Sequence, residues 1–195
     1  MNKKGNALRY LGKYEKAISI YDRYLEIEPD DNQTWNNKGL ALSDLGRYEE
    51  AIFAYKKSLE IKSDYHEAWN NKGYSLRYLG RYEQALSAFD KAIEIKRYFH
   101  DAWNNKGIAL RYLGRYEQAV FAFDKAIKIK QNSHYAWQNK GYALSNLEKY
   151  EEAIIAYDNA LEIKPDYEGA LYDKGYALSL LGRYKEEIYA YDKFL

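Results

Sequence analysis

The chain has 195 residues, and 30 Lys and Arg balance 29 Asp and Glu to a formal net charge of +1. This balance provides no overall field to attract nucleic acid or an anionic membrane, and the lack of cysteine excludes disulfide and thiol chemistry. The start, MNKKGNALRYLG, lacks the apolar core of a signal peptide, and no apolar run approaches the length of a membrane span. We therefore expect a cytoplasmic protein with no nucleic-acid and no membrane partner.

Tryptophan recurs every 34 residues, in strings such as AWNNKG, and residues 66–99 match residues 100–133 at 25 of 34 positions. A fixed period of this size is typical of a stacked array in which each repeat completes the core of its neighbour. We predict a single array over 1–195. Its units are a partial first unit 1–31, complete units 32–65, 66–99, 100–133 and 134–167, and a partial last unit 168–195.

Each complete unit predicts two helices joined by a tight turn. In 32–65, apolar and small residues from Trp35 to Leu42 have helical spacing, and a second such pattern begins at Tyr48. A glycine stands where the first helix must stop, as at Gly46, which predicts a left-handed residue there. Glu148 replaces this glycine in one unit, so we expect strain or a different geometry at that turn.

The two end units depart from the pattern. Met1 falls at the tryptophan position, and in the last unit Leu171 replaces Trp and Glu187 replaces a small Ala. Arrays usually end in a polar capping helix, and none is obvious here. Two explanations stay open: the sequence is a fragment of a longer array, or its ends pair with another chain.

Together these residues resemble the tetratricopeptide repeat (TPR) family over the whole chain. The resemblance is carried in one unit by Trp35, Gly39, Gly46, Tyr48, Ala51 and Tyr55, and it recurs one period on as Trp69, Gly73, Gly80, Tyr82, Ala85 and Phe89. Two departures are a Lys before the first glycine, as at Lys38, and a late proline kept only as Pro29 and Pro165. The resemblance implies an all-α fold, a right-handed superhelical solenoid of antiparallel helix pairs with about six TPR units, the first and last truncated. It also implies a non-catalytic protein–protein interaction scaffold whose first helices line a concave groove.

A helical wheel of the first helix puts Asn37 opposite the packing face that holds Trp35. Asn, Tyr and Arg recur on this side, where a merely solvated face would carry Lys and Glu. A carboxamide can pair with both groups of a peptide bond, so a row of Asn could hold an extended or helical peptide segment. Such a row resembles the asparagine ladder of peptide-binding TPR arrays and consists here of Asn37, Asn71, Asn105 and Asn139. The predicted peptide-binding residues are Asn36, Asn37, Asn70, Asn71, Asn104, Asn105, Asn139, Tyr74, Arg77, Tyr78, Arg111, Tyr112 and Tyr142.

Less specific interpretations of the same residues stay open. Recent duplication copies every residue, so the asparagines can be inherited without use, or they can bond locally between adjacent repeats. Tyrosine, at 23 residues, suits adaptable recognition but can also be no more than the preferred aromatic residue of this chain.

The sequence contains little that indicates catalysis. His66, His100 and His134 lie one repeat apart, too far to converge on one zinc ion, so a role at a helix start or in a turn is favoured. We predict no enzyme activity, no metal and no cofactor, and a protein or peptide as the partner. Two alternative functions are a self-assembling module that stacks or swaps through its truncated ends, and the recognition arm of a larger enzyme.

Overall fold

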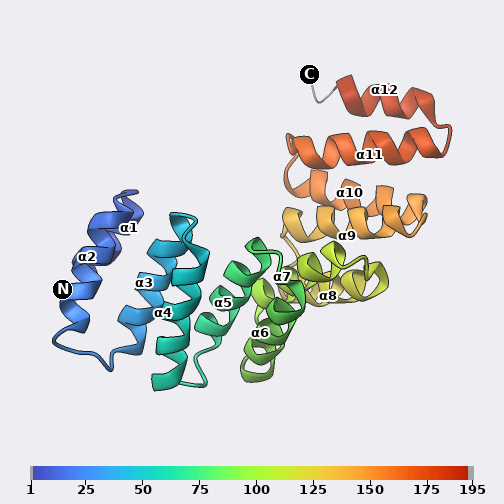
Figure 1. The fold of residues 1–195 in the computed structure, drawn as a ribbon. Helices are drawn as coiled ribbons and strands as arrows, with labels where there is room; N and C mark the ends of the chain where they lie inside the picture. The colour runs from blue at the N-terminus through green and yellow to red at the C-terminus, as the bar shows by residue number, and fades with distance from the viewer. Residues whose placement is uncertain (1, 193–195) are drawn as a thin grey trace. The chain divides into compact units, whose positions relative to one another are not determined.

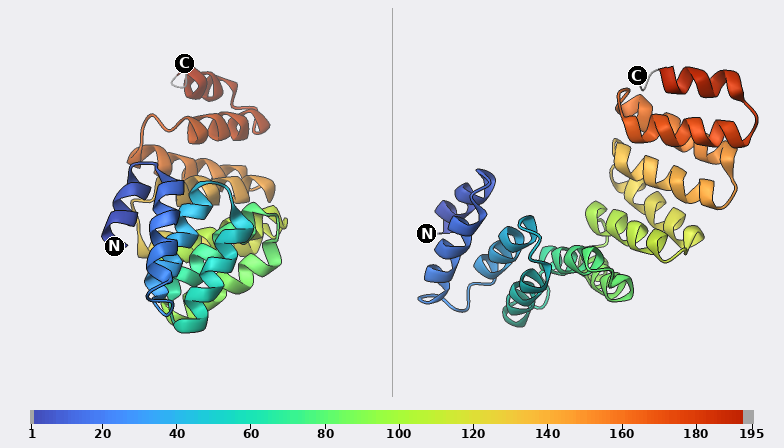
Figure 2. Two further views of the ribbon diagram at one scale, coloured as in Figure 1. Left: turned by 60° about the vertical axis from the view of Figure 1, so that its left-hand side comes forward. Right: turned by 45° about the horizontal axis from the view of Figure 1, so that its top comes forward.

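The computed structural model describes residues 2–192, and all regular secondary structure within them is α-helical. The chain forms two compact units, 1–97 and 98–195, and in each of them successive helices pair antiparallel (Figure 1; Figure 2). The first unit contains α1 (Asn2–Tyr10), α2 (Tyr14–Leu25), α3 (Asn32–Asp44), α4 (Tyr48–Ile61), α5 (His66–Tyr78) and α6 (Tyr82–Ile95). The second contains α7 (His100–Tyr112), α8 (Tyr116–Ile129), α9 (His134–Asn146), α10 (Tyr150–Ile163), α11 (Glu168–Leu180) and α12 (Tyr184–Asp192). The predicted all-α fold of helix pairs is confirmed.

A left-handed residue ends the first helix of each pair. At the end of α3, Gly46 has φ 76°, and the next N–H, of Arg47, donates to the carbonyl of Leu42 at 2.9 Å. Glu148 adopts the same conformation with φ 60°, and the Lys149 N–H donates to the carbonyl of Leu144 at 3.0 Å. The turn therefore keeps its geometry at Glu148, and the outcome of the substitution is strain, because the Cβ atom is crowded in this region.

An aromatic ring of the second helix packs directly on a glycine of the first. A Cβ atom at Gly39 would lie 2.5 Å from the ring of Tyr55, which is fully buried. The same close approach joins Gly141 to Tyr157 in the second unit. Any larger residue at these glycines would separate the two helices, which explains why glycine is tolerated inside a helix despite its cost there.

Tryptophan side chains form hydrogen bonds with the loop that connects successive repeats. The indole N–H of Trp35 donates to the carbonyl of Pro29 at 2.8 Å, and that of Trp69 donates to the carbonyl of Ser63 at 2.9 Å. Both acceptors stand at the position of the late proline, six residues before the indole. The interaction needs only a carbonyl oxygen, so the loss of proline from most repeats leaves it intact.

The last repeat keeps the packing of the first helix but exposes much of the second. Leu171 is buried although it replaces a tryptophan. On α12, by contrast, Tyr184, Ile188 and Tyr189 are each more than 60% exposed. The substitutions noted at this end of the sequence therefore accompany an open apolar surface on α12.

Candidate functional site

Three of the predicted binding residues form one cluster on α5. The Arg77 guanidinium lies 4.5 Å from the ring centre of Tyr78 and 5.1 Å from that of Tyr74. The two tyrosine rings are 4.7 Å apart, and Tyr78 also stacks on Tyr48 of α4 at 4.9 Å and 16°. Tyr78 remains 50% exposed. A cation held over aromatic rings on an accessible face is a combination enriched at the energetic centres of protein interfaces.

The two hydroxyl groups of this cluster have different acidities. The Tyr74 hydroxyl donates to that of Tyr78 at 3.1 Å. This hydrogen bond and the charge of Arg77 lower the pKa of Tyr78, whereas burial and the same hydrogen bond raise the pKa of Tyr74 to about 12. Tyr78, which is half-exposed, therefore has the more acidic hydroxyl of the two and is the better hydrogen-bond donor.

The second unit contains a corresponding cluster. The Arg111 guanidinium of α7 lies 4.4 Å from the ring centre of Tyr142 on α9 and 5.3 Å from that of Tyr112. Tyr112 is 54% exposed and Tyr142 38%. Here the arginine bridges the first helices of two successive repeats, and both tyrosines remain partly exposed.

The predicted asparagines differ in burial. Asn36 and Asn70 are 4% and 8% exposed, so the prediction that these two line an open groove is wrong. At Asn36 the next first helix, α5, contributes to this burial, because the Asn71 amide donates to the Asn36 side-chain oxygen at 3.1 Å. This pair supports the local-bonding interpretation, in which asparagine joins neighbouring repeats.

The second unit contains the same inter-repeat contact with other residues. The Gln138 amide donates to the Asp173 carboxylate at 2.9 Å, and the Tyr167 hydroxyl donates to the Gln138 side-chain oxygen at 2.6 Å. Burial raises the pKa of Asp173, and the bond from Gln138 opposes that rise. Asn139 instead donates to the carbonyl of Tyr135 in its own helix at 2.8 Å.

The remaining asparagines of the predicted set occupy intermediate positions. Asn37, Asn104 and Asn105 are half-buried, and Asn37 and Asn105 take part in further contacts. Of the predicted residues, the structure therefore brings together the Arg–Tyr clusters in each unit, while the asparagines lie beside them at the junctions between repeats.

The three histidines begin helices, as predicted from their spacing. His66, His100 and His134 are the first residues of α5, α7 and α9. A ring nitrogen of His100 lies 3.1 Å from the carbonyl oxygen of Ala126, which ties the start of α7 to the helix that follows it. Among residues 2–192, no three His, Asp or Glu side chains are grouped as metal ligands.

Sequence reasoning missed a series of ion pairs that join repeats. Lys140 of α9 pairs with Asp124 of α8 at 2.7 Å, and Lys174 of α11 pairs with Asp158 of α10 at 2.6 Å. Each aspartate stands 16 residues before its lysine, a recurrent spacing that the sequence contains. The unexpected lysine before the first glycine is therefore explained by a partner on the preceding second helix.

The second helices expose apolar side chains as well as charged ones. Phe53 of α4, Phe121 of α8 and Ile155 of α10 share one repeat position and are each more than half exposed. Phe53 meets Trp35 edge-on at 6.4 Å, and Phe121 meets Trp103 edge-on at 6.3 Å. Apolar surface is thus present on a second face, outside the predicted groove.

Stacked helix pairs with accessible aromatic and cationic side chains define this molecule as an α-helical repeat scaffold for protein–protein interaction. The tetratricopeptide repeat family model matches residues 1–64, 30–97, 64–132 and 134–167, so the chain belongs to the tetratricopeptide repeat family. Proteins of this family bind protein or peptide partners and are in general non-catalytic. No curated protein sequence is significantly similar to the chain.

Several solved structures share the fold. The crystal structure of MamA is 26% identical, covers 83% of this chain and 94% of its own, and has a TM-score of 0.76. YrrB, described as a TPR protein with an unusual peptide-binding site, is 22% identical, with 89% of each chain covered and a TM-score of 0.72. PilF of Pseudomonas aeruginosa is 19% identical, covers 97% of this chain and 86% of its own, and has a TM-score of 0.86. Among the described residues, no helix has both the length and the apolar character to span a bilayer.

Proposed function

We propose that the chain is a non-catalytic scaffold whose first helices bind an extended or helical peptide segment of a partner protein through an Arg–Tyr surface. The observation that carries the proposal is the cluster of Arg77, Tyr74 and Tyr78, repeated in the second unit by Arg111, Tyr112 and Tyr142. Tyrosine offers a large contact area with little conformational entropy to lose, and arginine and tyrosine are enriched among binding hot spots.

The charges around the first cluster favour a peptide with few charged side chains. Arg9 of α1 is already paired with Asp44 of α3 at 2.8 Å, so the charge of Arg9 is compensated and adds little attraction for a strongly acidic ligand. The arginine of the cluster lies over tyrosine rings and keeps its guanidinium edge for hydrogen bonds with peptide carbonyls or a single carboxylate. The partner segment expected here carries aromatic or aliphatic side chains and few charges.

Peptides selected from a displayed random library against the wild-type chain test this proposal. A double substitution, Arg77→Ala with Tyr78→Ala, should weaken their binding at least tenfold, because such residues contribute 2 kcal/mol or more when they are hot spots, about a thirtyfold change. Lys16→Ala, on the exposed surface of α2, is the control and should leave affinity unchanged. Peptides that bind the double variant as tightly as the wild type would show that the cluster is not the binding surface.

Self-assembly is a second candidate, favoured by the open apolar surface on α12. Tyr184, Ile188 and Tyr189 expose side chains that a second copy could cover. Light scattering over a hundredfold range of concentration decides this point. A mass that rises with concentration in the wild type and stays monomeric in Ile188→Glu would support self-assembly, and a monomer throughout would exclude it.

A further inference from the structure

Aspartate–lysine ion pairs join successive repeats, but at one junction of the first unit both residues are lysine. Lys38 of α3 pairs with Asp22 of α2 at 2.5 Å, sixteen residues earlier, as the corresponding lysines of the second unit do with Asp124 and Asp158. The next lysine in the first unit is Lys72 of α5, and the residue sixteen positions before it is Lys56 of α4. At this junction the chain supplies a second ammonium group where it elsewhere supplies a carboxylate.

Lys72 is held in place without its usual counter-ion. Its ammonium nitrogen lies 4.6 Å from the ring centre of Trp69, close enough for a cation–π interaction. Burial of about half the group and the nearby charge of Lys56 lower its pKa. Neither lysine forms an ion pair with a carboxylate of residues 2–192. The charge of Lys72 is therefore only partly compensated, by a π face and by solvent.

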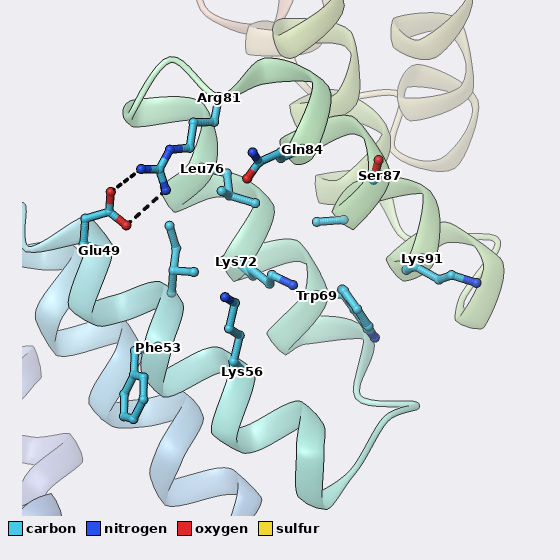
Figure 3. Close-up of a pocket in the computed structure, with 12 residues that line it drawn as sticks. Glu49, Phe53, Lys56, Trp69, Lys72, Leu76, Arg81, Gln84, Ser87 and Lys91 are labelled. Atoms are coloured by element: carbon cyan, nitrogen blue, oxygen red, sulfur yellow. Dashed lines mark hydrogen bonds and ion pairs between the residues drawn. The ribbon is translucent and has the colours of Figure 1, made fainter.

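A pocket of about 610 Å³ opens at this position between α4, α5 and α6 (Figure 3). Its apolar wall is formed by Ile52, Phe53, Trp69, Leu76 and Ala88. In the close-up, the amino groups of Lys56 and Lys72 lie near each other between Phe53 and Trp69. The pocket shares no residue with the Arg77 cluster, so a ligand here would be bound independently of the first-helix surface.

The other charged groups of the pocket are already paired. The Arg81 guanidinium binds both carboxylate oxygens of Glu49, at 2.6 and 3.1 Å (Figure 3), and Lys91 pairs with Glu94 at 2.7 Å. The lysines at 56 and 72 are thus the two cations of the pocket with no acidic partner in the part of the chain that the structure describes. A single anionic group between them would be stabilised by both charges.

We infer that this pocket binds a carboxylate side chain on an acidic segment of a partner protein, between Lys56 and Lys72. The carboxylate is favoured over an inorganic anion because an aspartate at the corresponding position pairs with a lysine at three other junctions of this chain. The apolar wall of the pocket also favours a protein segment over an inorganic anion. Aliphatic or aromatic side chains next to the acidic residue would cover Phe53 and Trp69, which a bare ion would leave in contact with water.

A short blocked peptide of leucine, glutamate and phenylalanine is a suitable probe, titrated against the full chain by NMR with the Trp69 indole and the lysine side-chain signals observed. The same peptide with glutamine in place of glutamate, and inorganic phosphate, are the comparison ligands. The expected result is saturable shifts at Trp69 and Lys72 with the glutamate peptide. Binding at least tenfold weaker is expected for the glutamine peptide and for phosphate.

Three substitutions make the test specific. Lys56→Asp restores the aspartate found at the other junctions, so the variant should fold, and we expect its affinity for the glutamate peptide to fall at least tenfold. Lys16→Asp makes the same change in net charge on the exposed surface of α2 and should have no effect. In the second unit, Asp124→Lys removes the carboxylate from Lys140 and should create a new site, reported by shifts at Trp137 that are absent from the wild type.

Three results would each overturn the inference. The first is equal binding of the glutamate peptide by the wild type and Lys56→Asp. The second is equal binding of the glutamate and glutamine peptides by the wild type. The third is phosphate binding as tight as that of the glutamate peptide, which would assign the pocket to inorganic anions instead of a partner side chain.

Discussion

The Asn71 amide donates a hydrogen bond at 3.1 Å to the side-chain oxygen of Asn36, one repeat earlier and almost completely buried. Two residues that the sequence assigns to a ligand surface thus bind each other across the junction of α3 and α5. Their first role is to join repeats, and any contact that Asn71 makes with a peptide is additional to that role.

Asn71→Ala is therefore expected to destabilise the fold. Removal of the donor leaves the buried Asn36 oxygen without this partner, a loss of about 1–3 kcal/mol in the free energy of unfolding. Chemical denaturation followed by circular dichroism measures the change. Asn139→Ala is the matched control, because its amide bonds to a carbonyl of its own helix at an exposed position, and a change within about 0.5 kcal/mol is expected there. Equal losses in the two variants would contradict the proposed role.

Glu148→Gly is expected to stabilise the second unit. A residue with a Cβ atom costs about 1–2 kcal/mol in the left-handed region, whereas glycine adds up to about 1 kcal/mol of entropy to the unfolded chain, so a net gain of about 0.5–1 kcal/mol should remain. Glu148→Ala removes the charge but keeps the Cβ atom, and we expect no comparable gain from it. If the alanine variant is stabilised as much as the glycine variant, the effect is one of charge and the strain interpretation fails.

Stability should fall in alkaline solution because of two buried tyrosines. Burial raises the pKa of Tyr55 and of Tyr157 above the ordinary value of 10.0, so above that pH the folded state retains protons that the unfolded state has released. The free energy of unfolding therefore decreases as pH rises beyond about 10. Tyr55→Phe with Tyr157→Phe should reduce this loss, measured by denaturation at pH 8 and pH 11.

The structure supports phenylalanine as the replacement, since Phe89 and Phe123 fill the same repeat position completely buried. Tyr135→Phe, at an exposed position, is the control and should leave the alkaline loss unchanged. A double variant as sensitive to alkali as the wild type would show that other groups cause the effect.

Lys72 should have the opposite effect on how the free energy of unfolding depends on pH. Because burial and Lys56 lower its pKa below 10.5, the unfolded state binds more protons between the lowered value and 10.5, and this group makes stability rise with pH in that window. Lys56→Asp should return the pKa of Lys72 towards its ordinary value, measured from the pH dependence of the side-chain carbon signals in NMR. An unchanged titration would mean that Lys56 does not act on Lys72.

The repeat period was sufficient to predict the helix pairs and their turns. The left-handed glycine at Gly46 and the glycine under the Tyr55 ring follow from chain geometry within one repeat, and sequence spacing records that geometry directly. The Arg–Tyr cluster of α5 could also be predicted from the sequence, because Arg77 and Tyr78 follow Tyr74 by three and four residues on a single helix.

Contacts between repeats were harder to predict. A helical wheel places Asn36 only one residue from Asn37 and cannot show that the next first helix covers it. The aspartate–lysine pairs, by contrast, leave a signal at a spacing of sixteen residues, and its interruption at Lys56 marks the pocket. This spacing therefore points to the pocket at Lys56 and Lys72, which includes second-helix residues and is missed when only first-helix residues are considered.

Chemical-shift mapping of a library-selected peptide on the wild-type chain tests the central claim most directly, with the tyrosine rings observed individually. We expect saturable shifts at Tyr78 in the first unit or at Tyr112 and Tyr142 in the second, and none at the exposed Tyr135. Saturable binding that shifts Tyr135 or the second-helix residue Phe121, and leaves the rings of both Arg–Tyr clusters unchanged, would contradict it.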